Sequence, residues 1–140
     1  QASVDETWAY VQEREAFGAP LVQYQGVSFP LAEAETQLTM MRQLCYYTLD
    51  LRDRGMPHTS QAAMCKWYLP KTACEILHQC LILHGHYGYT TDLPHHQRYN
   101  DVLGLQIGDG TAQIQKLVIA REKVGRVALQ YDNKSKGAAK

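Results

Sequence analysis

Apolar residues recur every three or four positions along most of the chain, which is the period of an amphipathic α-helix. Convincing alternation of apolar and polar residues, which would indicate strands, is absent from the sequence. The pattern predicts helices over 3–18, 31–55, 59–85, 94–104 and 111–127. Because these helices are long and joined by short loops, we predict an all-α fold, an up-and-down four-helix bundle with a short extra helix before the last helix.

The same spacing predicts which side chains face the core. The inward residues are expected to be Val4, Trp8 and Val11 in the first helix, Leu38, Met41, Leu44, Cys45, Tyr47, Leu49 and Leu51 in the second, and Ile114, Leu117, Val118 and Val124 in the last. Pro70 lies inside the third helical pattern, and proline lacks a backbone donor, so we expect a kink or a break there. Residues 19–30 are expected to form a loop.

Composition limits the partners and the location. The chain has 140 residues, of which 45 % are hydrophobic, so it has the size of one domain. We assign residues 1–130 to this domain and residues 131–140 to a frayed tail. The formal net charge is zero, which argues against nucleic acid as a partner. The apolar stretches are too short to span a membrane, and no signal-peptide pattern opens the chain.

Four cysteines lie in helical segments among apolar neighbours, and none forms a CxxC pair. They are Cys45, Cys65, Cys74 and Cys80. This pattern is typical of small buried side chains in a reduced protein rather than of disulfides. We therefore expect a cytoplasmic location.

Metal-binding patterns are weak. A di-iron site in a helical bundle needs two Glu-x-x-His pairs, and the chain offers one, Glu75 with His78, for which a polar helix face is the better interpretation. Four histidines gather loosely later in the chain: His84, His86, His95 and His96. No cysteine or carboxylate stands at ligand spacing from them, so we interpret them as surface or interface histidines and expect no metal.

A lone carboxylate near the end of the chain, Asp109, stands between Gly108 and Gly110 at the start of the last predicted helix. The hydroxyl of Thr111 can cap that helix. Free N–H groups and the helix dipole at this point could hold an anion or a polar cofactor edge beside Asp109. Local physics alone favours a simpler interpretation, because Asp-Gly is a common turn dipeptide.

Three segments together resemble the C-terminal helical domain of the acyl-CoA dehydrogenases. They are "REAFGAPLVQYQGVSFPLAE", "ILHGHYGYTTDLP" and "IGDGTAQIQKLVIAR", the last of which is similar to the family's Ile-x-Glu-Gly-Thr-x-x-Ile-Gln segment. Their order and spacing agree with the family from Tyr10 to Lys123. Three motifs in register are a much stronger signal than any one of them alone.

The resemblance implies an FAD-dependent enzyme that oxidises an acyl-CoA thioester to the trans-2-enoyl-CoA. Asp109 matches the family's common catalytic glutamate, a general base that we expect to lie in a dry pocket. Gly110 matches a glycine that contacts the substrate. The positions that match FAD-contacting residues are Arg14, Phe17, Gln25, Gly85, Thr111 and Gln113. Among them, Gly85 matches a glycine that approaches the adenosine part of FAD from a neighbouring subunit.

The sequence also departs from the family pattern. Aspartate is one methylene shorter than glutamate, which sets the carboxylate back by about 1.5 Å. Ile82 and His86 replace the usual glutamine and second glycine, and Asn100 stands where the family often has arginine. Some branches of the family carry the base on the first helix of this domain, in a part that would precede Gln1.

The family's N-terminal helical domain and middle β domain are not in this sequence. We therefore interpret the chain as the C-terminal fragment of a longer enzyme and expect the fragment alone to be inactive. The resemblance implies an acyl-CoA substrate, an electron-transfer partner of the flavoprotein type, and a homodimer or homotetramer. The alternative is a non-catalytic helical module for oligomerisation or interaction that is related to the family.

Overall fold

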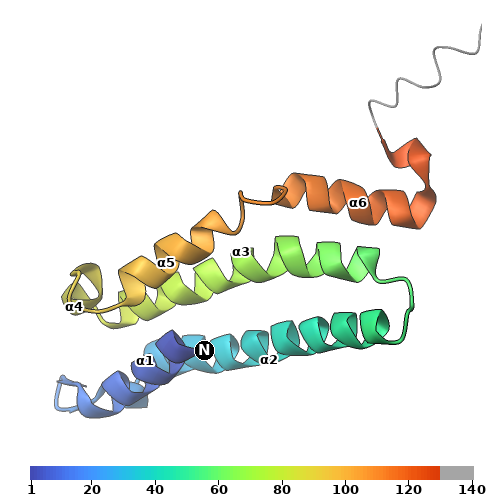
Figure 1. Ribbon diagram of the computed structural model, residues 1–140. Helices are drawn as coiled ribbons and strands as arrows, with labels where there is room; N and C mark the ends of the chain where they lie inside the picture. The colour runs from blue at the N-terminus through green and yellow to red at the C-terminus, as the bar shows by residue number, and fades with distance from the viewer. Residues whose placement is uncertain (130–140) are drawn as a thin grey trace, which may run out of the picture.

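The computed structural model describes residues 1–129 and is almost entirely helical (Figure 1). Its α-helices are α1 (Ala2–Glu13), α2 (Gln25–Asp53), α3 (Thr59–Leu83), α4 (His86–Tyr89), α5 (His95–Gly104) and α6 (Ala112–Val124). Two 3₁₀ turns, η1 (Leu21–Gln23) and η2 (Arg126–Ala128), and a small hairpin of β1 (Glu15–Ala16) and β2 (Ala19–Pro20) complete it. The predicted tail, 131–140, lies outside the described residues.

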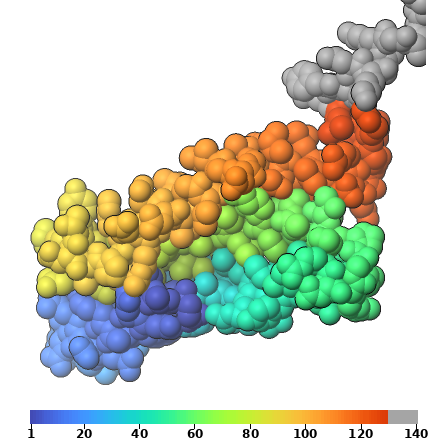
Figure 2. Space-filling model, in the orientation of Figure 1, coloured from blue at the N-terminus to red at the C-terminus, as the bar shows by residue number. Residues whose placement is uncertain are grey.

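Helix α3 lies in the middle of the molecule. Helices α1 and α2 run antiparallel to each other on one side of it, and α5 and α6 follow one another along the opposite side (Figure 1). In the space-filling view, α5 and α6 form a continuous outer layer over α3 (Figure 2). The all-α prediction with a short helix before the last one is confirmed, and the single-turn helix α4 is an addition.

The core lies where α1, α2 and α3 meet. Its buried members are Val4, Val11, Leu31, Ala34, Met41, Ile76 and Cys80, with Trp8 and Leu38 packed against them. This confirms the inward face predicted for the first helix. In α2 the buried stripe continues through Thr48, which lies seven residues after Met41 and so returns to the same face, whereas Leu49 and Tyr47 are exposed. The prediction was wrong for those two side chains.

The apolar stripe predicted for the last helix is not buried within residues 1–129. Ile114, Leu117 and Val124 are 51 %, 41 % and 60 % exposed, and α6 has no fully buried residue. The pattern correctly predicted a helix. The main neighbour of α6 in this chain is α3, which covers only one side of α6. The prediction of an inward face was therefore wrong for these three residues.

Two prolines lie inside helices. Pro70 was expected to kink or split the third helix, yet α3 runs unbroken from Thr59 to Leu83 with Pro70 buried. Helix α2 begins at Gln25 and contains Pro30, so half of the predicted loop is helical. Each proline removes one intrahelical donor, and tertiary packing of these long helices outweighs that loss.

Within the part of the chain that the structure describes, no helix combines the length and the apolarity that crossing a membrane requires.

Candidate functional site

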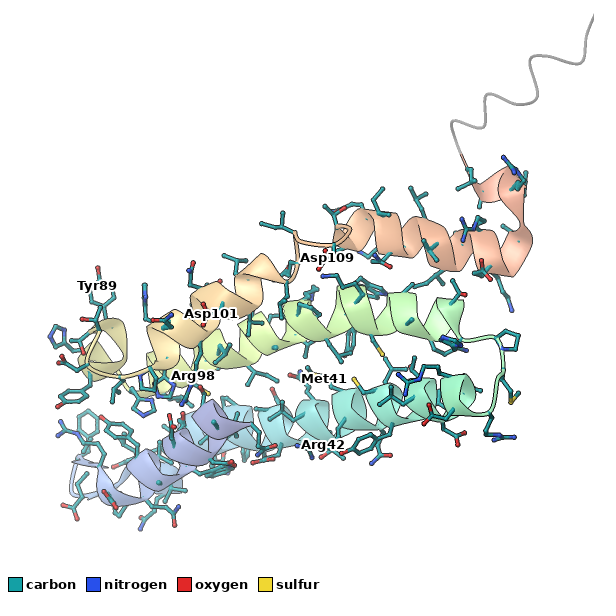
Figure 3. All side chains as sticks on the ribbon, viewed as in Figure 1. Met41, Arg42, Tyr89, Arg98, Asp101 and Asp109 are labelled. Carbon is teal, nitrogen blue, oxygen red and sulfur yellow. The ribbon has the colours of Figure 1, made fainter. Side chains whose placement is uncertain are left out.

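Asp109 lies on a tight elbow between α5 and α6 (Figure 3). The backbone N–H groups of residues 105–108 donate to carbonyls of residues 102–104, which continues α5 as a series of turns. Asp109 and Gly110 then take left-handed φ values of 54° and 96°. The φ of Gly110 favours glycine, whereas the only close neighbour of a Cβ there within residues 1–129, Nε2 of Gln115 at 2.8 Å, is the end of a flexible side chain that could move aside.

Thr111 begins α6 as the sequence predicted. Its side-chain oxygen accepts a hydrogen bond from the N–H of Ile114 at 3.5 Å. Gln113 follows in the first turn with an exposed side chain. The structure therefore brings Asp109, Gly110, Thr111 and Gln113 together at one helix N-terminus.

The carboxylate of Asp109 is exposed and makes no hydrogen bond or ion pair with any other residue in the range 1–129. The dry pocket expected around it is not formed by this part of the chain. Aspartate enters the left-handed region more readily than most non-glycine residues, so this conformation suits an Asp-Gly turn. The elbow thus presents an unpartnered carboxylate at a fixed place.

A second group of the predicted residues lies at the end of the molecule where α1 ends and α3 passes into α4. Arg14 and Gly85 line one open depression of about 380 Å³, together with the aromatic side chains of Tyr10 and Tyr87. Arg14 is exposed and makes no ion pair or side-chain hydrogen bond within the described range 1–129. Gly85 has a φ of 59°, the left-handed region, and precedes α4.

Phe17 lies at the tip of the β1–β2 hairpin. Ala16 pairs with Ala19, which leaves Phe17 and Gly18 as a two-residue loop with φ values of 53° and 81°. Positive φ at both positions is typical of a type I′ turn. The Phe17 side chain is 98 % exposed, and its ring meets Tyr24 edge-on at 6.4 Å. Gln25 follows Tyr24 directly and is the first residue of α2.

The predicted cofactor residues therefore form two groups rather than one. Arg14, Phe17, Gln25 and Gly85 belong to the end where the hairpin and α4 lie (Figure 1). The group around Asp109 lies midway along the other side of α3. One copy of this chain does not bring the two groups into contact.

Two of the four histidines interpreted as surface or interface residues are instead buried within this chain. His84 and His95 are only 5 % and 1 % exposed, whereas His86 and His96 are exposed. His84 stacks on Tyr10 with ring centroids 4.3 Å apart, and His95 lies 4.5 Å from His84. The eleven-residue connection between α3 and α5 folds back, which brings the two rings together in a way that spacing alone does not predict.

His95 is unusual among the buried groups. Its Nδ1 is the one buried side-chain nitrogen or oxygen within residues 1–129 that lacks a hydrogen-bond partner. Burial lowers the pKa of His95 below its ordinary value, and the neighbouring His84 lowers it further. Its surroundings therefore favour the neutral form of the ring.

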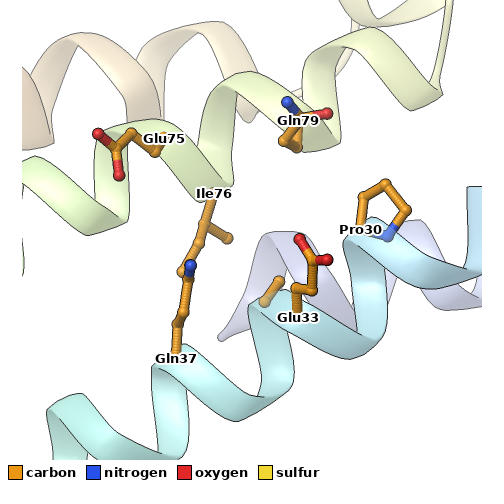
Figure 4. A pocket seen from close by; sticks show the side chains of 7 residues that line it. Pro30, Glu33, Gln37, Glu75, Ile76 and Gln79 are labelled. Carbon is orange, nitrogen blue, oxygen red and sulfur yellow. The ribbon is translucent and has the colours of Figure 1, made fainter.

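A cleft of about 220 Å³ opens between α2 and α3 (Figure 4). Glu33 of α2 and Glu75 of α3 both line it. Nζ of Lys71 lies 2.5 Å from Oε1 of Glu75, so this carboxylate already has a cation as its partner. In the part of the chain covered by the structure, no three His, Cys, Asp or Glu side chains are grouped as metal ligands.

Sequence reasoning missed the contacts that hold the elbow to α3. Nζ of Lys66 donates to the carbonyl of Leu105 at 2.5 Å, and Nε2 of Gln106 donates to Sγ of Cys74 at 3.2 Å. Beyond the elbow, Nζ of Lys116 lies 4.5 Å from the centre of the Trp67 ring. These partners are about 30 to 50 residues apart in sequence, and no local pattern marks them.

Comparison with known proteins identifies the family of this chain. The sequence matches the family profile described as acyl-CoA dehydrogenase, C-terminal domain, over residues 1–124. It is 36 % identical over 126 residues to an acryloyl-CoA reductase (NADH) of Anaerotignum propionicum, covering 90 % of this chain and 32 % of that protein. It is 38 % identical over 120 residues to the mitochondrial short-chain specific acyl-CoA dehydrogenase of Rattus norvegicus, covering 86 % of this chain and 29 % of that protein.

A solved structure agrees in fold. The glutaryl-CoA dehydrogenase from Mycobacterium smegmatis, in complex with FADH2, superposes with a TM-score of 0.85 at 26 % identity, covering 91 % of this chain and 33 % of that one. The chain thus spans about a third of the length of its curated relatives. Because the profile match covers nearly all of the described residues, this chain belongs to the acyl-CoA dehydrogenase family and represents its C-terminal helical domain.

Proposed function

We propose that this chain is the C-terminal domain of an FAD-dependent acyl-CoA dehydrogenase that converts an acyl-CoA thioester to the 2-enoyl-CoA. Residues 1–130 would form this domain. The observation that carries the proposal is Asp109, an unpartnered carboxylate in the left-handed region on a hydrogen-bonded elbow. The carboxylate is exposed and has no partner within residues 1–129, so it is free to act on a bound substrate.

Asp109 would act as the general base. The thioester carbonyl acidifies the α proton, and a carboxylate held within hydrogen-bond reach can accept it. Gly108 and Gly110 flank the carboxylate without side chains, so an acyl chain can approach it closely. Because Asp109 is exposed in this chain, other parts of the enzyme and the substrate would have to exclude water from it.

The residues present fit FAD. Arg14 is a guanidinium without an acidic partner among residues 1–129, and it lines a depression beside Gly85, which suits a diphosphate. Phe17 offers a nearly bare aromatic face, with Gln25 close to it in the chain as an exposed amide. FAD, when bound, would accept the β hydrogen of the substrate as hydride.

The other proposed cofactor contacts lie at the start of α6. Thr111 and Gln113 would hold polar atoms of the cofactor beside Asp109, where the helix N-terminus offers free N–H groups. Since the Arg14 group and the Asp109 group lie apart in one chain, each would serve a different FAD in a homodimer or homotetramer. Gly85 would then approach the adenosine part of the cofactor bound by a neighbouring subunit.

The printed names of the relatives suggest substrates to test first. One relative is a short-chain specific dehydrogenase and another an acryloyl-CoA reductase, so short acyl thioesters are the first choice. An electron-transfer protein of the flavoprotein type would reoxidise the enzyme. A cytoplasmic location remains a prediction.

A second candidate function is a non-catalytic helical module. The exposed apolar stripe of α6, which includes Ile114, Leu117 and Val124, favours it, because such a face is typical of an interface. An active oligomeric enzyme would use the same face. The coding sequence before Gln1 distinguishes the two, because an upstream β domain supports the enzyme.

The direct test is an acyl-CoA panel on the full-length protein with an artificial electron acceptor. We expect at least one short acyl-CoA to reduce the bound FAD. The reduced flavin should then pass its electrons to the artificial acceptor. A flavin-loaded protein that no acyl-CoA reduces would contradict the proposal and favour the module.

A further inference from the structure

Two consecutive residues of α3, Lys66 and Trp67, hold the two flanks of the elbow that carries Asp109. Lys66 donates to the carbonyl of Leu105, four residues before Asp109. Trp67 lies under the ammonium of Lys116, seven residues after Asp109 and in the second turn of α6. The two contacts therefore enclose the elbow from both sides and share one short stretch of α3.

The segment between these contacts has little freedom to move independently. From Leu105 to Gly108, every N–H donates to a carbonyl of residues 102–104. On the other side, Thr111 caps α6, so the chain is helical again from Ala112, two residues after Gly110. Only Asp109 and Gly110 lie between two hydrogen-bonded segments, and any shift of either flank shifts the carboxylate.

Each contact has a physical reason to persist. Lys66 places a positive charge at the carbonyl end of α5, where the helix dipole is negative. Lys116 over the Trp67 ring is a cation–π contact. Gln106 adds a third attachment through Sγ of Cys74, one residue beyond Leu105. Together they attach both flanks to the central helix rather than to solvent-facing loops.

We propose that Lys66 and Trp67 are positioning residues that set the height of Asp109 above α3, and thereby the distance from its carboxylate to the α carbon of the substrate. The inference rests on the proposed function of Asp109 as base. An aspartate has a shorter reach than a glutamate, so its backbone must be placed more closely. Misplacement by about 1 Å can lower a rate on the order of a hundredfold.

The test uses the full-length enzyme with Lys66→Met, Trp67→Leu and the double variant. Lys66→Arg keeps the donor and serves as the rescue variant. Lys71→Met removes a lysine of the same helix that pairs with Glu75 and does not contact the elbow, so it is the matched control. The measurements are flavin reduction by substrate in stopped flow, KM, flavin content and thermal unfolding.

We expect each single variant to slow flavin reduction about tenfold and the double variant about a hundredfold, with KM, flavin content and melting temperature little changed. Lys66→Arg and Lys71→Met should stay near the wild-type rate. Backbone amide exchange should quicken at residues 105–109 in Lys66→Met and nowhere else. A double variant with the wild-type rate, or a loss of rate that merely follows lost flavin or lost stability, would overturn the inference.

The two proposals can fail separately. A wild-type enzyme that no acyl-CoA reduces would refute the proposed function, and amide exchange at the elbow would still decide whether Lys66 and Trp67 anchor it. An active wild type with unaffected variants would refute the positioning role alone.

Discussion

Arg98 of α5 forms a bidentate salt bridge with Glu6 of α1. Nη1 lies 2.6 Å from Oε2 and Nη2 lies 2.9 Å from Oε1, while Nη1 also donates to the Ser3 hydroxyl at 3.0 Å. The two residues are separated by 92 positions in sequence, so the pair joins α5 to the first helix. The hydrogen bonds from Arg98 lower the pKa of Glu6.

The Glu6–Arg98 pair should contribute modestly to stability, because both side chains are partly exposed and solvent screens them. Arg98→Met and Glu6→Gln, combined in a double-mutant cycle, should give a coupling free energy of about 1 kcal/mol. The pKa of Glu6 is depressed on folding, so this contribution is present above its ordinary value of 4.5 and is lost as the pH falls through the folded value. Urea unfolding at pH 7 and pH 3 measures both the coupling free energy and its pH dependence. A coupling that is equal at the two pH values would contradict the assignment.

His95 should make the fold sensitive to mild acid. Folding lowers the pKa of this ring, whereas the unfolded chain takes up a proton near the ordinary pKa of 6.5. The free energy of unfolding is therefore unaffected by this site well above pH 6.5. It decreases as the pH falls below 6.5, by at most about 1.4 kcal/mol per pH unit. Glu6 opposes this effect, while His84 and Arg98 reinforce it.

His95→Leu should flatten that pH dependence, since leucine fills the buried space without a titratable group or an unpartnered nitrogen. His96→Leu is the matched control, because that neighbouring side chain is exposed. The measurement is the free energy of unfolding from pH 5 to pH 8. An unchanged slope in His95→Leu would mean that another group carries the dependence.

Arg14 should matter for FAD binding and not for folding. It has no partner to lose within residues 1–129, so Arg14→Met should leave the melting temperature unchanged. In the full-length enzyme, a lost charge-assisted contact to a diphosphate, worth about 1.5–3 kcal/mol, should weaken FAD binding by roughly tenfold to a hundredfold. Arg54→Met removes an exposed arginine at the far end of α2 as a control. Equal flavin affinity in both variants would refute the proposed contact.

Thr111 combines a local role and a proposed cofactor contact, and substitutions can separate them. Thr111→Ser keeps the hydroxyl, whereas Thr111→Val removes the acceptor for the N–H of Ile114 and should cost about 1 kcal/mol of stability. If Thr111 also contacts FAD, Thr111→Val should lower flavin affinity in the full-length enzyme and Thr111→Ser should not. Chemical denaturation and flavin titration are the two measurements.

Periodicity predicted what depends on short-range spacing. The inward face of the first helix, the end of the second helix two residues before the predicted residue 55, and the cap at Thr111 all follow from neighbours within one or two turns. The three motifs in register correctly indicated the family, because three separate segments had to agree with it in order and spacing. Such information is carried by the sequence itself.

Other features depend on what surrounds each segment. Pro70 stays helical because packing outweighs one lost hydrogen bond, and the stripe of Ile114 and Leu117 stays exposed because α6 packs mainly on α3. The burial of His84 and His95 requires the fold-back between α3 and α5. Contacts between residues far apart in sequence have no local signature.

The central claim is that the Asp109 carboxylate is the base, and flavin reduction by substrate in the full-length Asp109→Asn variant tests it most directly. The change keeps the shape and the elbow but removes the basic oxygen, so flavin reduction should slow on the order of 10²–10⁴-fold with FAD still bound. Asp101→Asn, which alters an exposed carboxylate of α5, should keep the wild-type rate. Reduction of FAD at the wild-type rate in Asp109→Asn would contradict the assignment.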